Sequence, residues 1–226
     1  MEHPILFLDL IFSSFGLHIP PHISYAVLVA LILLGLGLLA SRQISLVPKG
    51  AQNVFELIVG GLEEFMVEVT GEEGRAFFPY IACVFLFIMF CNLIGLVPGF
   101  LSPTANINTT LALALCTFAY THFLGVKYHG VKYIKHFLGP IPALAPLFFP
   151  IEVIGHFARV LSLTLRLFGN IMGEDLVLLI LLLLAGKFLA PIQLMMGLAV
   201  FTSVVQAFVF TLLSMMYFAG SMEHAH

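Results

Sequence analysis

The chain has 226 residues, of which 61% are hydrophobic and 9% are charged, and its formal net charge at pH 7 is −3. Soluble proteins contain about 45–50% apolar and about 25% charged residues, so this composition excludes a soluble domain and predicts an integral membrane protein. Nine Lys and Arg residues against twelve Asp and Glu leave no dense basic surface, and we expect no nucleic-acid partner. Cys83, Cys91 and Cys116 lie in apolar segments without CxxC spacing, which favours packing over disulfides or metal ligation.

The first part of the chain predicts one span and one amphipathic helix. Residues 1–20 carry an acid where a signal peptide carries Lys or Arg, and we interpret them as a leader that is not removed. The apolar run 24–41 predicts the first span. In 52–69, apolar residues recur every three or four positions opposite four glutamates. This segment is typical of a helix that lies on the membrane surface or against a partner and does not span.

Residues 76–126 contain no charged side chain. The stretch is too long for one span of about 20 residues, and Pro98 and Pro103 lie in a loop-forming sequence that interrupts it. We therefore predict two spans, at 77–97 and 104–125.

A basic loop and a proline-rich stretch follow, and two long helices are predicted after them. They cover 152–184 and 191–220, with a short turn around Gly186. Helices of this length exceed the bilayer thickness and are expected to tilt. The predicted fold is a single all-α polytopic membrane domain over 1–226. It has about five membrane-crossing helices and a surface amphipathic helix, and its last two helices form a long tilted hairpin.

The orientation follows from the basic residues of the short loops. They are concentrated in the first and third loops: Arg42, Lys49, Arg75, Lys127, Lys132 and Lys135. Because basic loops stay in the cytoplasm, we expect the N-terminus outside and the C-terminus inside. The two halves show no inverted repeat, which disfavours a secondary transporter.

Arg166 is the most informative residue, because it lies in the middle of the fourth predicted span. A charge at the bilayer centre costs at least about 2.5–3.5 kcal/mol. Along a helix, Glu152 and Asp175 lie roughly 21 Å and 13 Å away, and Asp175 points to the opposite side. Either Arg166 pairs with a structural carboxylate inside the bundle, or it acts on an acidic partner outside the chain. We favour the second, because the other predicted spans carry no acid.

Small and polar residues surround Arg166 along its helix: Ser162, Gly169, Asn170 and Gly173. The Gly169 to Gly173 spacing allows close approach of another helix, either a partner or a neighbouring span. Gln206 is a strongly polar side chain deep in the last span. It would lie beside Arg166 in a packed hairpin, although an ordinary interhelical hydrogen bond explains it equally well.

Residues 162–170 (SLTLRLFGN) resemble the signature of subunit a of the F-type ATP synthase, the stator half of its proton channel. Segments 92–99 (NLIGLVPG), 103–111 (PTANINTTL) and 206–210 (QAFVF) resemble other family motifs in the expected order. The similarity covers roughly residues 45–226. It implies a subunit that conducts protons between the membrane faces and a rotating c-ring, beside which the last two helices lie. It also implies that the chain catalyses no covalent reaction by itself.

The resemblance implies roles for individual residues. Arg166 matches the essential arginine that faces the c-ring, favours the ionised form of each ring carboxylate and blocks leakage between two offset half-channels. The other pathway residues it implies are Glu152 and Ser162 in the cytoplasm-side half-channel, Asn170, Asp175 and Gln206 near the arginine and the outer half-channel, the neighbouring acid Glu174, and Tyr217 near the end of the last helix.

Two positions depart from the family pattern. Ala199 stands where some members place a His or Glu that partners the outer-channel acid, and Asn106 stands where some carry an acid. We therefore expect the outer half-channel to depend mainly on Glu174, Asp175 and water. Weaker pathway candidates are His156, Asn106 and His122. A lone histidine near a helix end is also typical of a structural hydrogen bond.

The implied partners are the c-subunit ring, the peripheral-stalk b subunits, other ATP synthase subunits and lipid of a bacterial inner membrane. No cofactor or metal is implied. An alternative is a self-contained transporter or channel, with Glu152, Arg166 and Asp175 along its path, but it needs an internal counter-charge for Arg166. A membrane enzyme is disfavoured because the chain has no HExxH, GxSxG or P-loop pattern. A pure scaffold would not need an arginine at this depth.

Overall fold

The computed structural model describes residues 8, 16, 19–42, 51–130, 133, 145–185 and 190–222. Its long elements are the helices α2 (Pro21–Arg42), α3 (Ala51–Thr70), α4 (Phe78–Ile94), α5 (Ile107–His129), α7 (Ala145–Ala185) and α8 (Ala190–Met222), joined in part by the short 3-10 helices η1 (Glu72–Phe77) and η2 (Pro103–Ala105). Five segments within these ranges are long and apolar enough to cross a membrane. They confirm the prediction of an all-α polytopic membrane protein.

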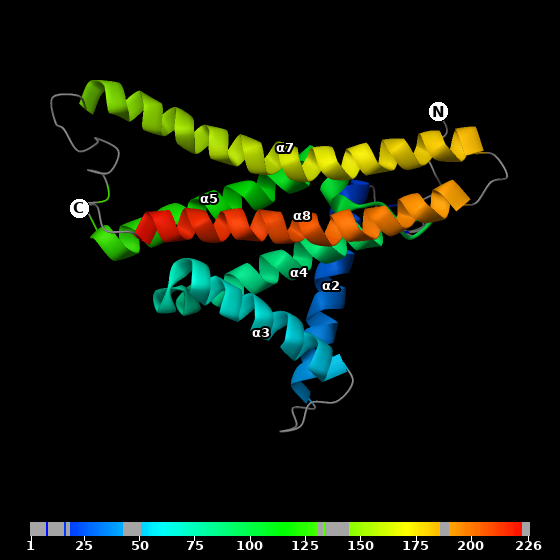
Figure 1. The fold of residues 1–226 in the computed structure, drawn as a ribbon, viewed down its shortest axis with the longest axis horizontal. Coiled ribbons are helices and arrows are strands. Elements are labelled where there is room, and N and C mark those ends of the chain that lie inside the picture. The colour runs from blue at the N-terminus through cyan, green and yellow to red at the C-terminus, as the bar shows by residue number, and fades with distance from the viewer. Residues whose placement is uncertain are drawn as a thin grey trace.

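The two longest helices, α7 and α8, run antiparallel along the long axis of the molecule (Figure 1). α5 packs against both of them, and α4 packs against α8. α2 crosses this group steeply in the view of Figure 1 and contacts α4 and η2. The predicted hairpin of the last two helices is therefore present, although the turn at Gly186 lies outside the described residues.

The start of α7, which lies in the proline-rich stretch, differs from the boundary predicted from the sequence. α7 begins at Ala145 rather than at Glu152 and contains Pro150. Pro146 occupies the first turn, where a backbone N–H has no helical acceptor. Pro150 removes one further hydrogen bond near the start of a helix of 41 residues, which the remaining bonds tolerate.

The connection between α4 and α5 is longer than the sequence predicted. α4 ends at Ile94, three residues before the predicted end. α5 starts at Ile107, because Pro103–Ala105 form η2 and Asn106 caps the helix. The Asn106 Oδ1 accepts a hydrogen bond from the Asn108 backbone N–H at 2.9 Å, a typical N-cap contact.

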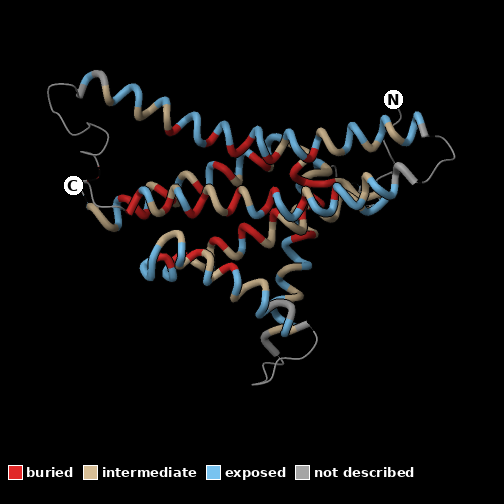
Figure 2. The backbone as a smooth tube through the Cα atoms, viewed as in Figure 1, coloured by how far each residue is buried: buried red, intermediate tan, exposed pale blue. Residues whose placement is uncertain are grey.

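The hydrophobic core is formed by α3, α4, α5, α7 and α8. α7 contributes one stripe to it, with Leu163, Leu167 and Ile171 buried at four-residue spacing. Most of the rest of α7 is exposed, as Figure 2 shows along its length. Because the exposed side chains are largely Leu, Ile, Val and Phe, this face requires lipid or another subunit to cover it.

α3 is amphipathic, as predicted, and it is not among the segments suited to span a membrane. The sequence left open whether its apolar side meets lipid or a partner. In the structure Leu62 and Met66 are buried in the core, and the Phe65 ring lies 5.2 Å from the Phe208 ring of α8. The apolar side of α3 therefore packs against its own chain.

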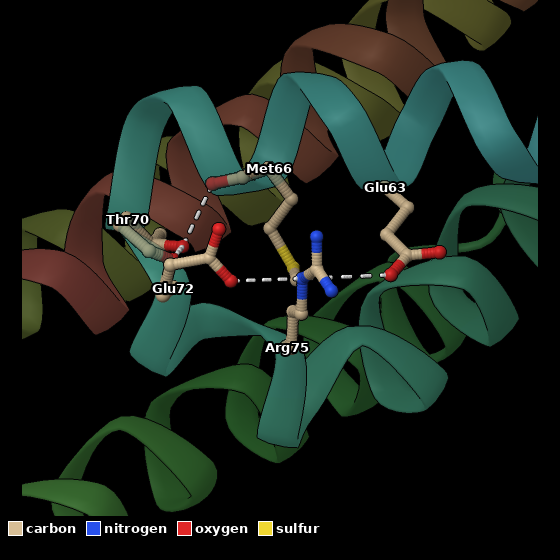
Figure 3. A network of polar contacts seen from close by, with 6 residues as sticks. Glu63, Met66, Thr70, Glu72 and Arg75 are labelled. Carbon is tan, nitrogen blue, oxygen red and sulfur yellow. Dashed lines mark hydrogen bonds and ion pairs between the residues drawn. The ribbon is translucent and has the colours of Figure 1, made fainter.

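Polar contacts hold the turn from α3 to η1 (Figure 3). The Arg75 Nε lies 3.1 Å from Glu72 Oε2 and 3.8 Å from Glu63 Oε1. The Thr70 hydroxyl donates to the Met66 carbonyl at 2.7 Å. Because the charged side chains are exposed, each ion pair contributes roughly 0–1 kcal/mol. These contacts orient the turn, whereas the burial of apolar side chains holds α3 in place.

Candidate functional site

Arg166 lies on the outer side of α7. Leu163 and Leu167, which flank it along the helix, are buried, whereas Arg166 is exposed. None of the ion pairs among the described residues involves Arg166, and no hydrogen bond of its side chain occurs there. Pairing of Arg166 with a structural carboxylate was the alternative interpretation of the sequence. The described residues contain no such partner for Arg166.

Beyond Arg166, polar side chains join α7 to α8. The Asn170 Nδ2 donates to the Gln206 Oε1 at 2.5 Å, and Gln206 is buried. One turn further along α7, the Glu174 carboxylate accepts a hydrogen bond from the Thr202 hydroxyl. The structure thus places Gln206 against Asn170, four residues along α7 from Arg166.

The other candidate residues take no part in these hydrogen bonds between α7 and α8. Asp175 is exposed on α7, and Ser162 is exposed one turn before Arg166. Ala199 is buried among packed side chains, so the position offers no polar group to the α7 acids. Asn106 caps α5 with its side chain, and its contact there is with the backbone of its own helix.

Towards the start of α7, residues of α5, α7 and α8 line a partly open cavity of about 250 Å³. Its lining residues include Thr121, Tyr133, Glu152, His156, Arg159, Tyr217 and Ser221. A smaller pocket of about 10 Å³ shares part of this wall and extends to Leu163, three residues before Arg166. The larger cavity has room for several water molecules, and the smaller one for about one.

His156 lines this cavity, and His122 lies next to two of its lining residues, His156 and Tyr133. The His156 Nε2 is 3.5 Å from the Glu152 Oε1, and the His122 Nδ1 is 2.8 Å from the Tyr133 hydroxyl. The two imidazole rings lie 4.8 Å apart. Burial raises the pKa of the Tyr133 phenol above its usual value, so this hydroxyl stays protonated at neutral pH.

Some residues of the site were not expected from the sequence. The Arg159 guanidinium lies over the Tyr217 ring, 5.5 Å from its centroid, in a cation–π contact. Arg159 is a second arginine on the predicted span that carries Arg166, and this feature of the sequence could have pointed to it. No pattern marked Thr202 or Tyr133, because packing between separate helices brings them to the site. The described residues hold no group of three His, Cys, Asp or Glu side chains suited to a metal ion.

The fold and the site define a class of protein. This is a multi-pass α-helical membrane protein in which an exposed arginine lies between two polar regions of one helix pair. Residues 23–219 match the protein family described as ATP synthase A chain.

Relatives match over the whole chain. It is 57% identical over 240 aligned positions to "ATP synthase subunit a" of Syntrophobacter fumaroxidans and 58% identical over 230 positions to the protein of the same name from Desulfosudis oleivorans. It is 52% identical over 234 positions to that of Citrifermentans bemidjiense, and each alignment covers 100% of both proteins. The chain therefore belongs to the ATP synthase A chain family, which confirms the resemblance seen in its motifs.

Proposed function

We propose that this chain is the proton-translocating stator subunit of a rotary ATP synthase. It carries protons between the two membrane faces and a ring of c subunits, and it catalyses no covalent reaction itself. The observation that carries the proposal is the exposed Arg166, which has no ion-pair partner in the described part of the chain. The names of its full-length relatives support the same function.

Arg166 acts on a carboxylate of the ring. A fixed cation favours the ionised form of a nearby carboxylic acid, so a protonated ring site that reaches Arg166 loses its proton. Exposed apolar residues of α7 and α8 supply the surface on which the ring turns, among them Leu161, Leu165, Phe201 and Val205. The same positive charge repels protons and prevents a direct leak along α7.

The cavity lined by Glu152, His156 and Tyr217 is the cytoplasm-side half-channel. It lies beside Ser221 at the C-terminal end of α8, and the basic residues of the first and third loops favour a cytoplasmic position for that end. Water in the cavity brings protons within one helical turn of Arg166, because the smaller pocket extends to Leu163. Ser162, exposed on α7 at this level, continues the polar path towards the ring.

The outer half-channel lies on the other side of Arg166. Glu174 and Asp175 exchange protons with water, and the Asn170–Gln206 hydrogen bond holds the amides next to the arginine. The Gln206 Nε2 is buried without a hydrogen-bond partner among the described residues, and an unsatisfied buried donor of this kind is costly. One proton that crosses a membrane potential of 100 mV releases about 2.3 kcal/mol of free energy. The synthesis of each ATP therefore requires several protons.

The proposed function is tested by reconstitution of the ATP synthase in liposomes. The complete complex is expected to acidify the liposome interior when ATP is supplied outside, and a complex that lacks this chain is expected not to. The chain alone is expected to leave proton permeability at the level of empty liposomes, because the ring supplies the acid that Arg166 needs. Rapid proton conduction by the chain alone would instead support the self-contained channel.

The cytoplasmic half-channel is tested by the reactivity of a cysteine at Thr121, which lines the cavity. In a background with Cys83, Cys91 and Cys116 replaced by alanine, Thr121→Cys is expected to react from the cytoplasmic side with a small charged thiol reagent. Thr211→Cys is the matched control, because Thr211 is also buried but is absent from the cavity lining. We expect an about tenfold faster reaction at position 121, since the reactive thiolate requires water. Equal rates would contradict the assignment.

A further inference from the structure

Two motifs of the sequence have no role in the proposed proton path. They lie in segments 92–99 and 103–111, at the end of α4 and around η2. Their polar side chains Asn92 and Thr104 are 2% and 0% exposed, and Ser102 between them is 2% exposed. Buried polar groups in a membrane protein need partners, and the partners of these three connect separate helices.

The contacts form a continuous chain, which we call the α4–α8 latch and define by Asn92, Ser102 and Thr104. The Thr104 hydroxyl donates to the Asn92 Oδ1 at 2.6 Å and lies 2.7 Å from the Ser102 hydroxyl. The Ser102 hydroxyl also lies 2.9 Å from the Cys91 carbonyl. The Asn92 Nδ2 donates to the Ser203 carbonyl of α8 at 3.2 Å. The latch thus ends on a single carbonyl of the helix that carries Gln206.

Gly95 makes this arrangement possible. A Cβ atom at Gly95 would lie 2.6 Å from the Ser102 Cβ and 3.1 Å from the Ser102 backbone. Contacts this short are not tolerated, so a larger residue would push the loop away from α4. The glycine therefore allows the loop to deliver Ser102 and Thr104 to Asn92.

The hydrogen bonds of the latch are suited to fix the register of α8 against α4. Apolar side chains would fill the same space between α4 and α8, but they would tolerate sliding of one helix along the other. A hydrogen bond from Asn92 to one carbonyl does not tolerate such sliding, because a shift of one helical turn moves that carbonyl by about 5.4 Å. Single buried polar residues fix helix register in this way in coiled coils.

We infer that the latch positions α8 so that Gln206 meets Asn170 next to Arg166. Ser203, on which the latch ends, lies one turn before Gln206 on α8. Asn92 and Thr104 are therefore positioning residues for proton transfer at the arginine, although neither lies on the path. This inference rests on the proposed function of the chain.

The first test replaces the Thr104 hydroxyl and measures ATP-driven acidification of inverted vesicles per assembled complex. Thr104→Val keeps the shape of the side chain and is expected to lower pumping roughly tenfold, whereas Thr104→Ser is expected to restore it. Thr211→Val is the matched control and is expected to pump normally, because the Thr211 hydroxyl bonds only within its own helix, to Ala207. Normal pumping per complex in Thr104→Val would overturn the inference, whatever the amount of complex.

The second test asks whether the latch acts through Gln206. Gln206→Asn keeps the amide but shortens the side chain, so it is expected to pump weakly. Thr104→Val is expected to cause no further loss in that background, and Asn92→Leu is expected to behave as Thr104→Val does. An equal fold loss in both backgrounds, or failure of Thr104→Val and Asn92→Leu to assemble, would overturn the inference.

Failure of the proposed function gives a different result from failure of the latch. If the chain does not carry protons, Gln206→Asn alone pumps as the unmodified complex does. If the latch has no positioning role, Gln206→Asn still loses pumping and Thr104→Val does not share that loss.

Discussion

Arg166→Ala is expected to abolish ATP-driven proton pumping by the assembled complex. Without the guanidinium, a ring carboxylate has no cation to favour its ionised form, and we expect a loss of more than about 100-fold. The fold is expected to survive, because Arg166 is exposed and makes no ion pair within the described residues. Exposed substitutions of this kind change stability by about 0.5 kcal/mol or less.

Acidification of inverted membrane vesicles measures this effect, and immunoblots of the purified complex control for assembly. Arg166→Lys is the informative companion variant, because it keeps a positive charge but loses the planar fork of donors. We expect its pumping to lie between those of the unmodified complex and Arg166→Ala. If an assembled Arg166→Ala complex pumps normally, the arginine is structural and the proposed mechanism is wrong.

The double substitution Glu174→Gln with Asp175→Asn is expected to cause the second largest loss. Both acids lie beyond Arg166 on α7, and in the proposed outer half-channel they are the groups that exchange protons with water. Each single variant leaves one acid to do so, and we expect a partial loss. Removal of both leaves no acid there among the residues that the structure describes, and we expect pumping to fall by about 100-fold, as when an acid–base group is lost.

The matched control is Glu68→Gln, the same chemical change at an exposed position of α3 that has no part in the proposed path. Its pumping is expected to equal that of the unmodified complex. Pumping is again measured per assembled complex in inverted vesicles. A double variant that pumps normally would place the outer half-channel elsewhere, away from the C-terminal half of α7.

Helix boundaries show where sequence reasoning is weakest. Pro150 favoured a loop before the predicted helix, but in the structure it lies inside α7. A proline near the start of a long helix removes only one of its many backbone hydrogen bonds, so the helix can include it. Similarly, the residues after Ile94 were read as the end of a span, whereas they turn towards η2 so that Ser102 reaches Asn92. That turn depends on a contact between segments, which periodicity does not report.

The membrane class, the helical fold and the family could all be predicted from the amino-acid sequence, which also singled out Arg166 as the residue to test. These follow from composition, from the lengths of apolar runs and from one motif, because the bilayer admits few structures and penalises an unexplained charge. Which side chains meet could not be read from the sequence. Packing between helices brings Thr202 to Glu174 and Gln206 to Asn170, and it forms the cavity beside Glu152 from residues of α5, α7 and α8. Such pairs depend on how far each helix is rotated and shifted against its neighbour, and side-chain packing, rather than local sequence, determines that register.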